Sequence, residues 1–244
     1  MERTARTFAQ IGRSLVFAVA SALTLTVFAS EPEPPPTAGL IPVTQCAIER
    51  GSVRSRDPED AKSMCAGAGA AIQFFQSHGV SLDGSVRIVI GEELPSGISS
   101  LAVGCFSRSD RISYVLSYEK FVARKYWLGL QVNRQLYETV ASHEVAHAIA
   151  SCASASTSLT TEATEYLAFV TMFETMDPKT AREALSAYPG EVFESVWDIN
   201  EVVYGLNPIR FGIMAYRHYL KQVDRSAFVR EILSGTVLGP RYFY

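Results

Sequence analysis

A continuous apolar run near the beginning of the chain is the first pattern of hydrophobic positions. Residues 14–30 carry no charge, and three arginines lie within the thirteen residues before them. This order of basic and apolar segments is typical of a secretory signal peptide, and the run is short for a membrane span. We expect residues 1–29 to be a signal peptide and the mature protein to be periplasmic or secreted, with no stable membrane span. An uncleaved N-terminal anchor is the alternative.

Apolar residues then recur with the spacing of strands. Residues 30–42 are rich in proline and predict an extended linker. Alternation over 43–49 and a β-branched run at 86–90 each predict a strand. Two further strands are predicted at 98–106 and 111–117, joined by a turn of serine, arginine and aspartate.

Helical patterns dominate the rest of the chain. Asp57-Pro58 followed by two acids is typical of a helix start, because the acids complement the positive end of the helix. The predicted helices cover 57–77, 118–125, 133–151, 161–176, 177–188, 193–204, 209–223 and 226–233. Strands followed by a run of helices predict an α+β fold. We expect residues 43–244 to form a single domain.

The charge of the chain argues against a nucleic-acid partner. Removal of residues 1–29 leaves 19 basic and 24 acidic residues, a net charge of −5. No basic cluster with interleaved aromatic residues occurs in the sequence. The hydrophobic content of 48% is sufficient for one sizeable core.

Four cysteines, at positions 46, 65, 105 and 152, predict two disulfides in an exported protein. Four cysteines allow three pairings, of which we favour Cys46–Cys65 and Cys105–Cys152. Metal ligation by these cysteines is the alternative, and it is disfavoured because no C-x-x-C spacing occurs.

The candidate chemistry lies in the segment Ser142-His143-Glu144-Val145-Ala146-His147, which contains H-E-x-x-H. On a helix, residues four apart project from one face about 6 Å apart along the axis. His143 and His147 can therefore bind one Zn²⁺, while Glu144 lies beside the metal and can accept a proton from water. The alternative is a buried helix whose histidines are satisfied by ordinary hydrogen bonds.

The H-E-x-x-H and its uncharged flanks resemble the signature of the zincin superfamily of metallopeptidases. The resemblance implies a small sheet packed on the active-site helix and a helical C-terminal portion that closes the other side of a cleft. A third histidine does not follow at the H-E-x-x-H-x-x-G-x-x-H spacing, which excludes that subclass.

A downstream carboxylate is therefore expected to complete the site, because a catalytic zinc usually has three protein ligands. A short loop makes the helix at 161–176 an antiparallel neighbour of the motif helix. Equal depth along the two helices favours Glu165 as the third ligand, with Glu162 as the alternative. This arrangement resembles the gluzincins, although Thr164 and Phe169 stand where their best-known pattern has Asn and Asp.

Other residues have weaker signals. Many zincins stabilise the oxyanion with a Tyr or His from the C-terminal part, and His218 and Tyr216 are the candidates here. Their alternative is an ordinary core position. Arg217 is a candidate for a substrate carboxylate, and His78 is expected to end a helix without a functional role.

These observations predict a zinc-dependent metallopeptidase with Glu144 as general base and a peptide or protein substrate. The first alternative is a catalytically silent zinc-binding or scaffold protein of the cell envelope. The second is a zinc hydrolase acting on a non-peptide amide, although cell-wall amidases usually have other ligand patterns.

Overall fold

A computed structural model describes residues 41–48, 50–82, 84–154 and 159–240. The expected signal peptide and nearly all of the expected linker lie outside the described residues. Residues from Leu40 onward form one compact unit by themselves. The described part is mixed α+β, which confirms the predicted fold class.

The main sheet has five strands in the order β1-β2-β3-β5-β4. These strands are β1 (Val43–Gln45), β2 (Gly51–Arg54), β3 (Val86–Gly91), β5 (Ile112–Leu116) and β4 (Gly104–Ser107). The pairs β2–β3 and β3–β5 are parallel, whereas the two outer pairs are antiparallel. In β3 the side chains of Val86, Ile88 and Ile90 are buried and Arg87 is exposed, so one face of the sheet packs on the core.

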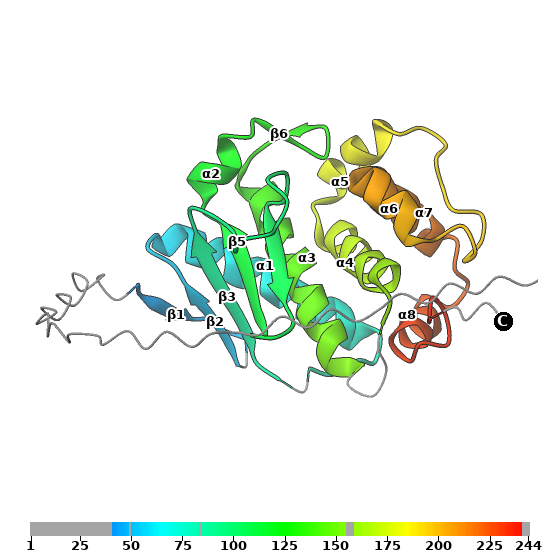
Figure 1. Ribbon diagram of the computed structural model, residues 1–244, viewed down its shortest axis with the longest axis horizontal. Coiled ribbons are helices and arrows are strands. Elements are labelled where there is room, and N and C mark those ends of the chain that lie inside the picture. Colours follow the sequence, from blue (N-terminus) through cyan, green and yellow to red (C-terminus); the bar gives the residue numbers. More distant parts are fainter. Residues whose placement is uncertain (1–40, 49, 83, 155–158, 241–244) are drawn as a thin grey trace, which may run out of the picture. The chain divides into compact units, whose positions relative to one another are not determined.

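Two long helices cover the buried side of the sheet. Helix α1 (Pro58–Ser77) contacts β2 and β3, and α3 (Arg134–Ala153) contacts β4 and β5. Helix α4 (Thr161–Thr175) packs on both, and α7 (Pro208–Leu220) packs on α4 (Figure 1). The remaining elements are α2 (Tyr118–Val122), the hairpin β6 (Tyr126–Trp127) and β7 (Leu130–Gln131), α5 (Pro178–Ser186), α6 (Glu201–Leu206) and α8 (Arg225–Leu233).

Helices α1 and α3 approach each other closely at Gly67. A Cβ atom built on Gly67 would lie 2.0 Å from the Glu138 carbonyl oxygen, so only glycine fits there. Ser142 on α3 donates a hydrogen bond of 3.0 Å to the Gly67 carbonyl. This contact fixes the helix that carries the H-E-x-x-H motif against its neighbour.

Several element boundaries differ from the expected ones. The strand expected at 98–106 is confined to β4, because residues 94–103 form turns, and β2 was not predicted because four residues are too short for a clear alternation. The helix expected at 193–204 is wrong: residues 191–200 are irregular, and α6 begins at Glu201 after its N-cap Asn200. The Asn200 side chain accepts bonds from two backbone amides, so it starts the helix there.

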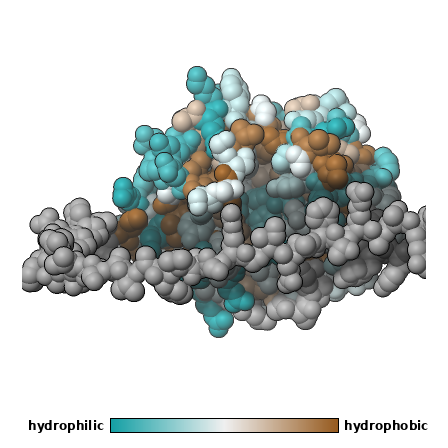
Figure 2. Space-filling view, viewed as in Figure 1, coloured by the Kyte–Doolittle hydropathy of each residue, from teal (hydrophilic) through white to brown (hydrophobic). Residues whose placement is uncertain are grey.

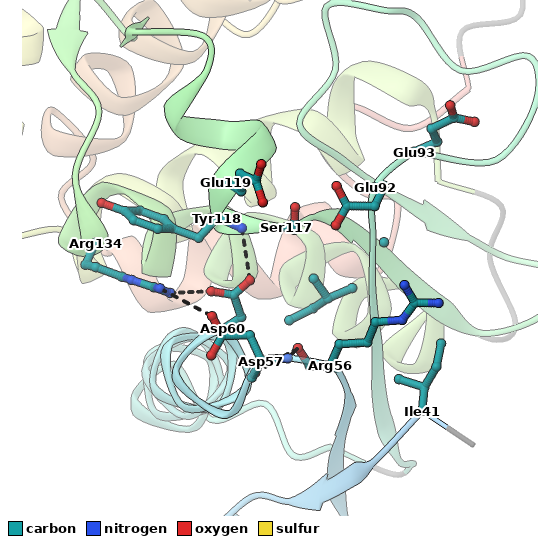
Figure 3. A pocket seen from close by; sticks show the side chains of 13 residues that line it. Ile41, Arg56, Asp57, Asp60, Glu92, Glu93, Ser117, Tyr118, Glu119 and Arg134 are labelled. Atoms are coloured by element: carbon teal, nitrogen blue, oxygen red, sulfur yellow. Dashed lines mark hydrogen bonds and ion pairs between the residues drawn. The ribbon is translucent and has the colours of Figure 1, made fainter. Parts of the chain in front are cut away.

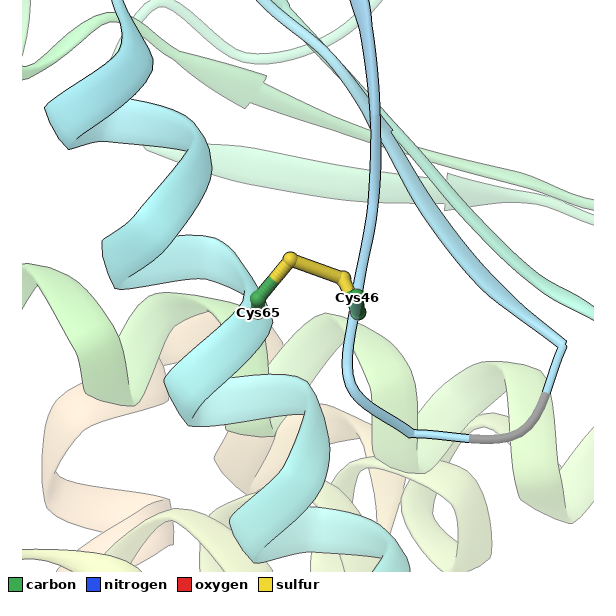
Figure 4. The surroundings of a disulfide bond; sticks show 2 residues. All are labelled: Cys46 and Cys65. Atoms are coloured by element: carbon green, nitrogen blue, oxygen red, sulfur yellow. A yellow bond between two sulfur atoms is a disulfide. The ribbon is translucent and has the colours of Figure 1, made fainter.

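One disulfide joins Cys46 to Cys65 and ties the segment after β1 to α1, as predicted (Figure 4). The expected Cys105–Cys152 disulfide is wrong, because both cysteines are free. Cys105 of β4 lines a cavity beside Glu144 of α3. Cys152 lies on α3 eight residues after Glu144, which is about 12 Å along the helix axis. Two cysteines so far apart cannot be bridged without movement of the backbone.

No described helix is long and apolar enough to cross a membrane. On the face that Figure 2 presents, hydrophobic and hydrophilic residues are interspersed. Large apolar side chains that are exposed, such as Leu101 and Leu206, come from several segments, although Val202 and Leu206 share α6. Scattered exposed apolar residues of this kind are ordinary for a folded chain.

We expect the Cys46–Cys65 disulfide to contribute about 3 kcal/mol to the free energy of unfolding, because it closes a loop of 19 residues. Denaturant unfolding of a Cys46→Ala, Cys65→Ala variant should show this loss. The matched control is Cys105→Ala, Cys152→Ala, which removes two cysteines without removing a crosslink. Equal losses in the two variants, or fewer than two free thiols in the denatured, unreduced protein, would contradict the assignment.

Candidate metal centre

Helix α3 is held in place along its length by side chains of neighbouring elements. The Asn133 side chain caps its first turn by accepting a bond from the Leu136 amide. Tyr137 donates a hydrogen bond of 2.7 Å to the Leu116 carbonyl at the end of β5. About two turns further, Ser113 of β5 donates to the Glu144 carbonyl at 3.2 Å. These bonds set the rotation of the helix, and hence the direction in which the motif side chains point.

His143, His147 and Glu165 lie together between α3 and α4. The two Nε2 atoms are 3.3 Å apart, and each lies 3.5 Å from one oxygen of the Glu165 carboxylate. All three side chains are largely buried, with 13–15% of their surface exposed. Together they form a group that can hold a metal ion.

The spacing of these atoms fits a tetrahedral metal. Ligands bound at about 2.0–2.1 Å in a tetrahedron lie roughly 3.3–3.4 Å from one another. The 3.3 Å between the two Nε2 atoms is close to this value, and each Nε2 lies 3.5 Å from a different oxygen of the Glu165 carboxylate. Glu162, the alternative ligand, is not part of the group. It lies in the first turn of α4, where an acid complements the helix dipole.

The ionisation of Glu165 and His147 also suits metal binding, whereas the raised pKa of His143 favours the protonated form, whose proton a metal must displace. Burial opposes the charge on Glu165, but His147 and His143 outweigh it and hold its pKa below the usual range. Burial lowers the pKa of His147 to about 4. Burial also disfavours the charged form of His143, but its hydrogen bond to Glu165 raises its pKa overall. An ionised carboxylate and a neutral imidazole are the forms that bind metals.

Glu144 lies in the same cavity and lacks a hydrogen-bond partner. Its side chain is 5% exposed, and its Oε2 atom is buried without a partner among the described residues. Burial, with a smaller contribution from Glu165, raises its pKa to about 7. A carboxylate with a pKa near neutrality is suited to accept and return a proton.

Strand β4 approaches Glu144 without a side chain in between. A Cβ atom on Gly104 would lie 2.7 Å from Oε1 of Glu144. Glycine therefore leaves room for the carboxylate between β4 and α3. The cavity, about 370 Å³ in volume, also takes in Ser99, Cys105, Arg108, Thr164 and Tyr204.

Tyr204 is a site residue that the sequence did not reveal. It lies on α6, lines the cavity, and its hydroxyl is hydrogen-bonded to Glu165. This bond contributes to the low pKa of Glu165. No sequence motif identifies Tyr204, which was expected to end a helix at 193–204. The residues around Tyr204 give no indication that it lies beside α4.

The Phe169 side chain lies against His143. The two rings are 4.7 Å apart in an edge-to-face arrangement. The Nδ1 atom of His143 is buried and has no hydrogen-bond partner among the described residues. His143 is thus oriented by packing and by Glu165, without the hydrogen-bonding group that usually fixes the tautomer of a metal-binding histidine.

The residues expected to stabilise an oxyanion do not line this cavity. His218 accepts or donates a hydrogen bond of 2.9 Å with Tyr166 in the core, and Tyr216 donates to Glu174 near the end of α4. The structure therefore brings neither residue to the cavity: α7 packs on α4 with Gly212 against Phe169, but its His218 and Tyr216 are bonded to Tyr166 and Glu174 instead. The guanidinium group of Arg217 has a structural role, because it donates hydrogen bonds to three backbone carbonyls at the end of α5 and just after it. His78 ends α1 as expected, bonded to Tyr219 at 2.8 Å.

A larger cavity of about 640 Å³ lies near the ends of β2 and β3 (Figure 3). Its most buried charged residue is Asp60. One oxygen of the Asp60 carboxylate accepts a hydrogen bond from Arg134 at 2.5 Å, and the other accepts one from the Tyr118 amide at 3.0 Å. Arg134 in turn lies 3.7 Å above the Tyr118 ring. These partners satisfy Asp60 and anchor the first turn of α3, so this cluster of charges has a structural role.

The chain belongs to a family whose model matches residues 52–241 and whose description is a family of unknown function (DUF6639). The matched region includes all the residues of the metal-binding group. No curated protein and no solved structure is detectably similar to the chain.

The surroundings of Cys105 give a test of the cavity in the metal-free protein. Burial, followed by the charge of Glu144, raises its pKa from 9.0 to about 11. In a Cys152→Ser variant at pH 9, its thiolate fraction is then roughly fiftyfold below that of an ordinary thiol, and alkylation by iodoacetamide should be slowed in proportion.

A second substitution separates the charge of Glu144 from burial. Glu144→Gln in the same background removes a negative charge, lowers the pKa of Cys105 and should accelerate alkylation. Glu138→Gln, on the same helix but outside the cavity, is the matched control and should leave the rate unchanged. Alkylation at the rate of an exposed thiol would show that Cys105 does not lie in this environment.

Proposed function

We propose that this protein is an exported zinc-dependent metallopeptidase of gluzincin type. The observation that carries the proposal is the convergence of His143, His147 and Glu165 on a place that can hold a metal ion. Glu144 lies beside them, and its Oε2 atom has no partner among the described residues. The H-E-x-x-H sequence supports the same chemistry. Zinc is the metal proposed, because two imidazoles and one carboxylate with an open position are a usual catalytic zinc set.

A zinc ion bound by these residues would lower the pKa of a water molecule and polarise the carbonyl of the bond to be cleaved. The chain itself supplies the proton transfers. Glu144 accepts a proton from the attacking water and donates it to the leaving amine, for which its raised pKa is suited. Tyr204 lies beside Glu165 and adds, after the two histidines, to the low pKa of this ligand.

The proposed export rests on the N-terminal sequence and agrees with the disulfide. A Cys46–Cys65 bond is typical of proteins that fold in an oxidising compartment. The apolar run at residues 14–30 is the expected route to that compartment.

A silent metal-binding protein is the second candidate, and one observation favours it. The Phe169 ring against His143 leaves the Nδ1 atom without the partner that many catalytic zinc sites have. Loss of such a partner typically lowers metal affinity or activity 10- to 100-fold. The two candidates agree on the metal and differ only in hydrolysis, so separate measurements distinguish them.

Metal content is the first measurement. We expect one equivalent of zinc in the purified protein, which Glu165→Gln should reduce strongly because an amide is a poor substitute for an anionic ligand. Glu162→Gln, three residues away on the same helix, is the matched control and should retain the metal. Metal lost only from the Glu162 variant would reassign the third ligand, and a folded parent that binds no metal would refute the site.

Hydrolysis is the second measurement. Glu144→Gln should retain zinc but lower kcat for peptide cleavage by about 10²- to 10⁴-fold, because general acid–base catalysis contributes that much. Glu138→Gln is the control on the same helix. A Glu144 variant that cleaves as fast as the parent would rule out the proton-transfer role. A zinc-loaded parent that cleaves no peptide in a diverse library would favour the silent alternative.

A further inference from the structure

Arg108 is the one side chain with a permanent positive charge among the described residues that line the metal cavity. It follows β4 directly, in the turn that leads to β5. Within the described part of the chain, no hydrogen bond or ion pair engages its guanidinium group. Arg124 and Arg134, by contrast, donate to carbonyl or carboxylate oxygens nearby.

The carboxylate nearest to Arg108 in sequence is used within the turn. Ser107 donates to one oxygen of Asp110 at 2.9 Å, and Ser109 donates to the other at 3.1 Å. Arg87 donates to the backbone carbonyl of the same residue. The turn is thus held by its own side chains and leaves the charge of Arg108 without a partner.

The carboxylates of the cavity do not neutralise Arg108 either. Glu165 is held by the two histidines and Tyr204, and Glu144 is buried against β4. Arg108 is exposed to solvent and lines the same cavity as the metal-binding group. The cavity therefore has a metal-binding group at one place and an unpaired cation at another.

We propose that Arg108 binds a carboxylate of the substrate, so that preferred peptides carry an acidic side chain or a free carboxyl terminus near the cleaved bond. The planar guanidinium group matches a carboxylate with two parallel hydrogen bonds. This inference rests on the proposed peptidase function. It assigns to Arg108 the role that the sequence had suggested for Arg217, which is occupied by backbone carbonyls.

The experiment compares matched peptides with the zinc-loaded protein. One pair differs only by Glu against Gln in the side chain, with the carboxyl terminus amidated. The other pair differs only by a free against an amidated terminus. Initial rates give kcat and KM for the parent, for Arg108→Gln and Arg108→Lys, and for the control Arg111→Gln, which removes the same charge from a neighbouring residue that does not line the cavity.

We expect the parent to prefer one acidic peptide over its neutral match, and Arg108→Gln to remove that preference by raising KM about tenfold. A hydrogen bond to a charged group contributes roughly that factor. Arg108→Lys should keep part of the preference that Arg108→Gln loses, because lysine retains the positive charge but cannot form two parallel hydrogen bonds with a carboxylate. The pair that shows the effect identifies the source of the carboxylate.

Peptide binding to the Glu144→Gln protein gives a readout that does not depend on turnover. Calorimetry should show tighter binding of the acidic peptide, with the difference lost in the Glu144→Gln, Arg108→Gln double variant. Cleavage or binding that ignores the carboxylate in both pairs would overturn the role of Arg108 and leave the peptidase proposal intact. A protein that neither binds nor cleaves any of the peptides would overturn both.

Discussion

The burial of two imidazoles and two carboxylates between α3, α4 and β4 is the constraint on which the rest of this structure depends. Ionisable groups in a dry interior are costly unless they are paired, hydrogen-bonded or bound to a metal. His143, His147 and Glu165 partly satisfy one another at 3.3–3.5 Å, but Nδ1 of His143 and Oε2 of Glu144 have no partner among the described residues. A bound cation offsets part of this cost, because it supplies the charge that the protein atoms lack.

The surrounding fold keeps these groups at fixed distances. Gly67 lets α1 contact the backbone of α3, and Gly104 lets β4 approach Glu144. Asp60 and Arg134, which line the larger cavity, anchor the first turn of α3. Their ion pair therefore stabilises the helix whose histidines line the smaller cavity. Because each contact lies at a different point along α3, no single one of them determines the position of the motif.

The two cavities differ in how their charges are used, and this difference is more informative than their volumes. In the larger cavity, the most buried charge is fully engaged by Arg134 and a backbone amide. In the smaller one, one oxygen of Glu144 and Nδ1 of His143 are buried without partners within the described residues. Unsatisfied buried polar groups in a cavity are typical of functional sites, since they are tolerated where a ligand completes them.

The local features of this protein could be predicted from its residue pattern. The H-E-x-x-H spacing placed two histidines on one helical face, helix depth selected Glu165 over Glu162, and strands followed by helices gave the fold class. Contacts between distant segments required the tertiary structure. Tyr204 lies beside Glu165 although it belongs to another helix. His218 and Tyr216 are bonded to residues outside the cavity. Cys105 and Cys152 remain free cysteines. The physical reason is that periodicity records which face of an element is buried, but not which other element covers it.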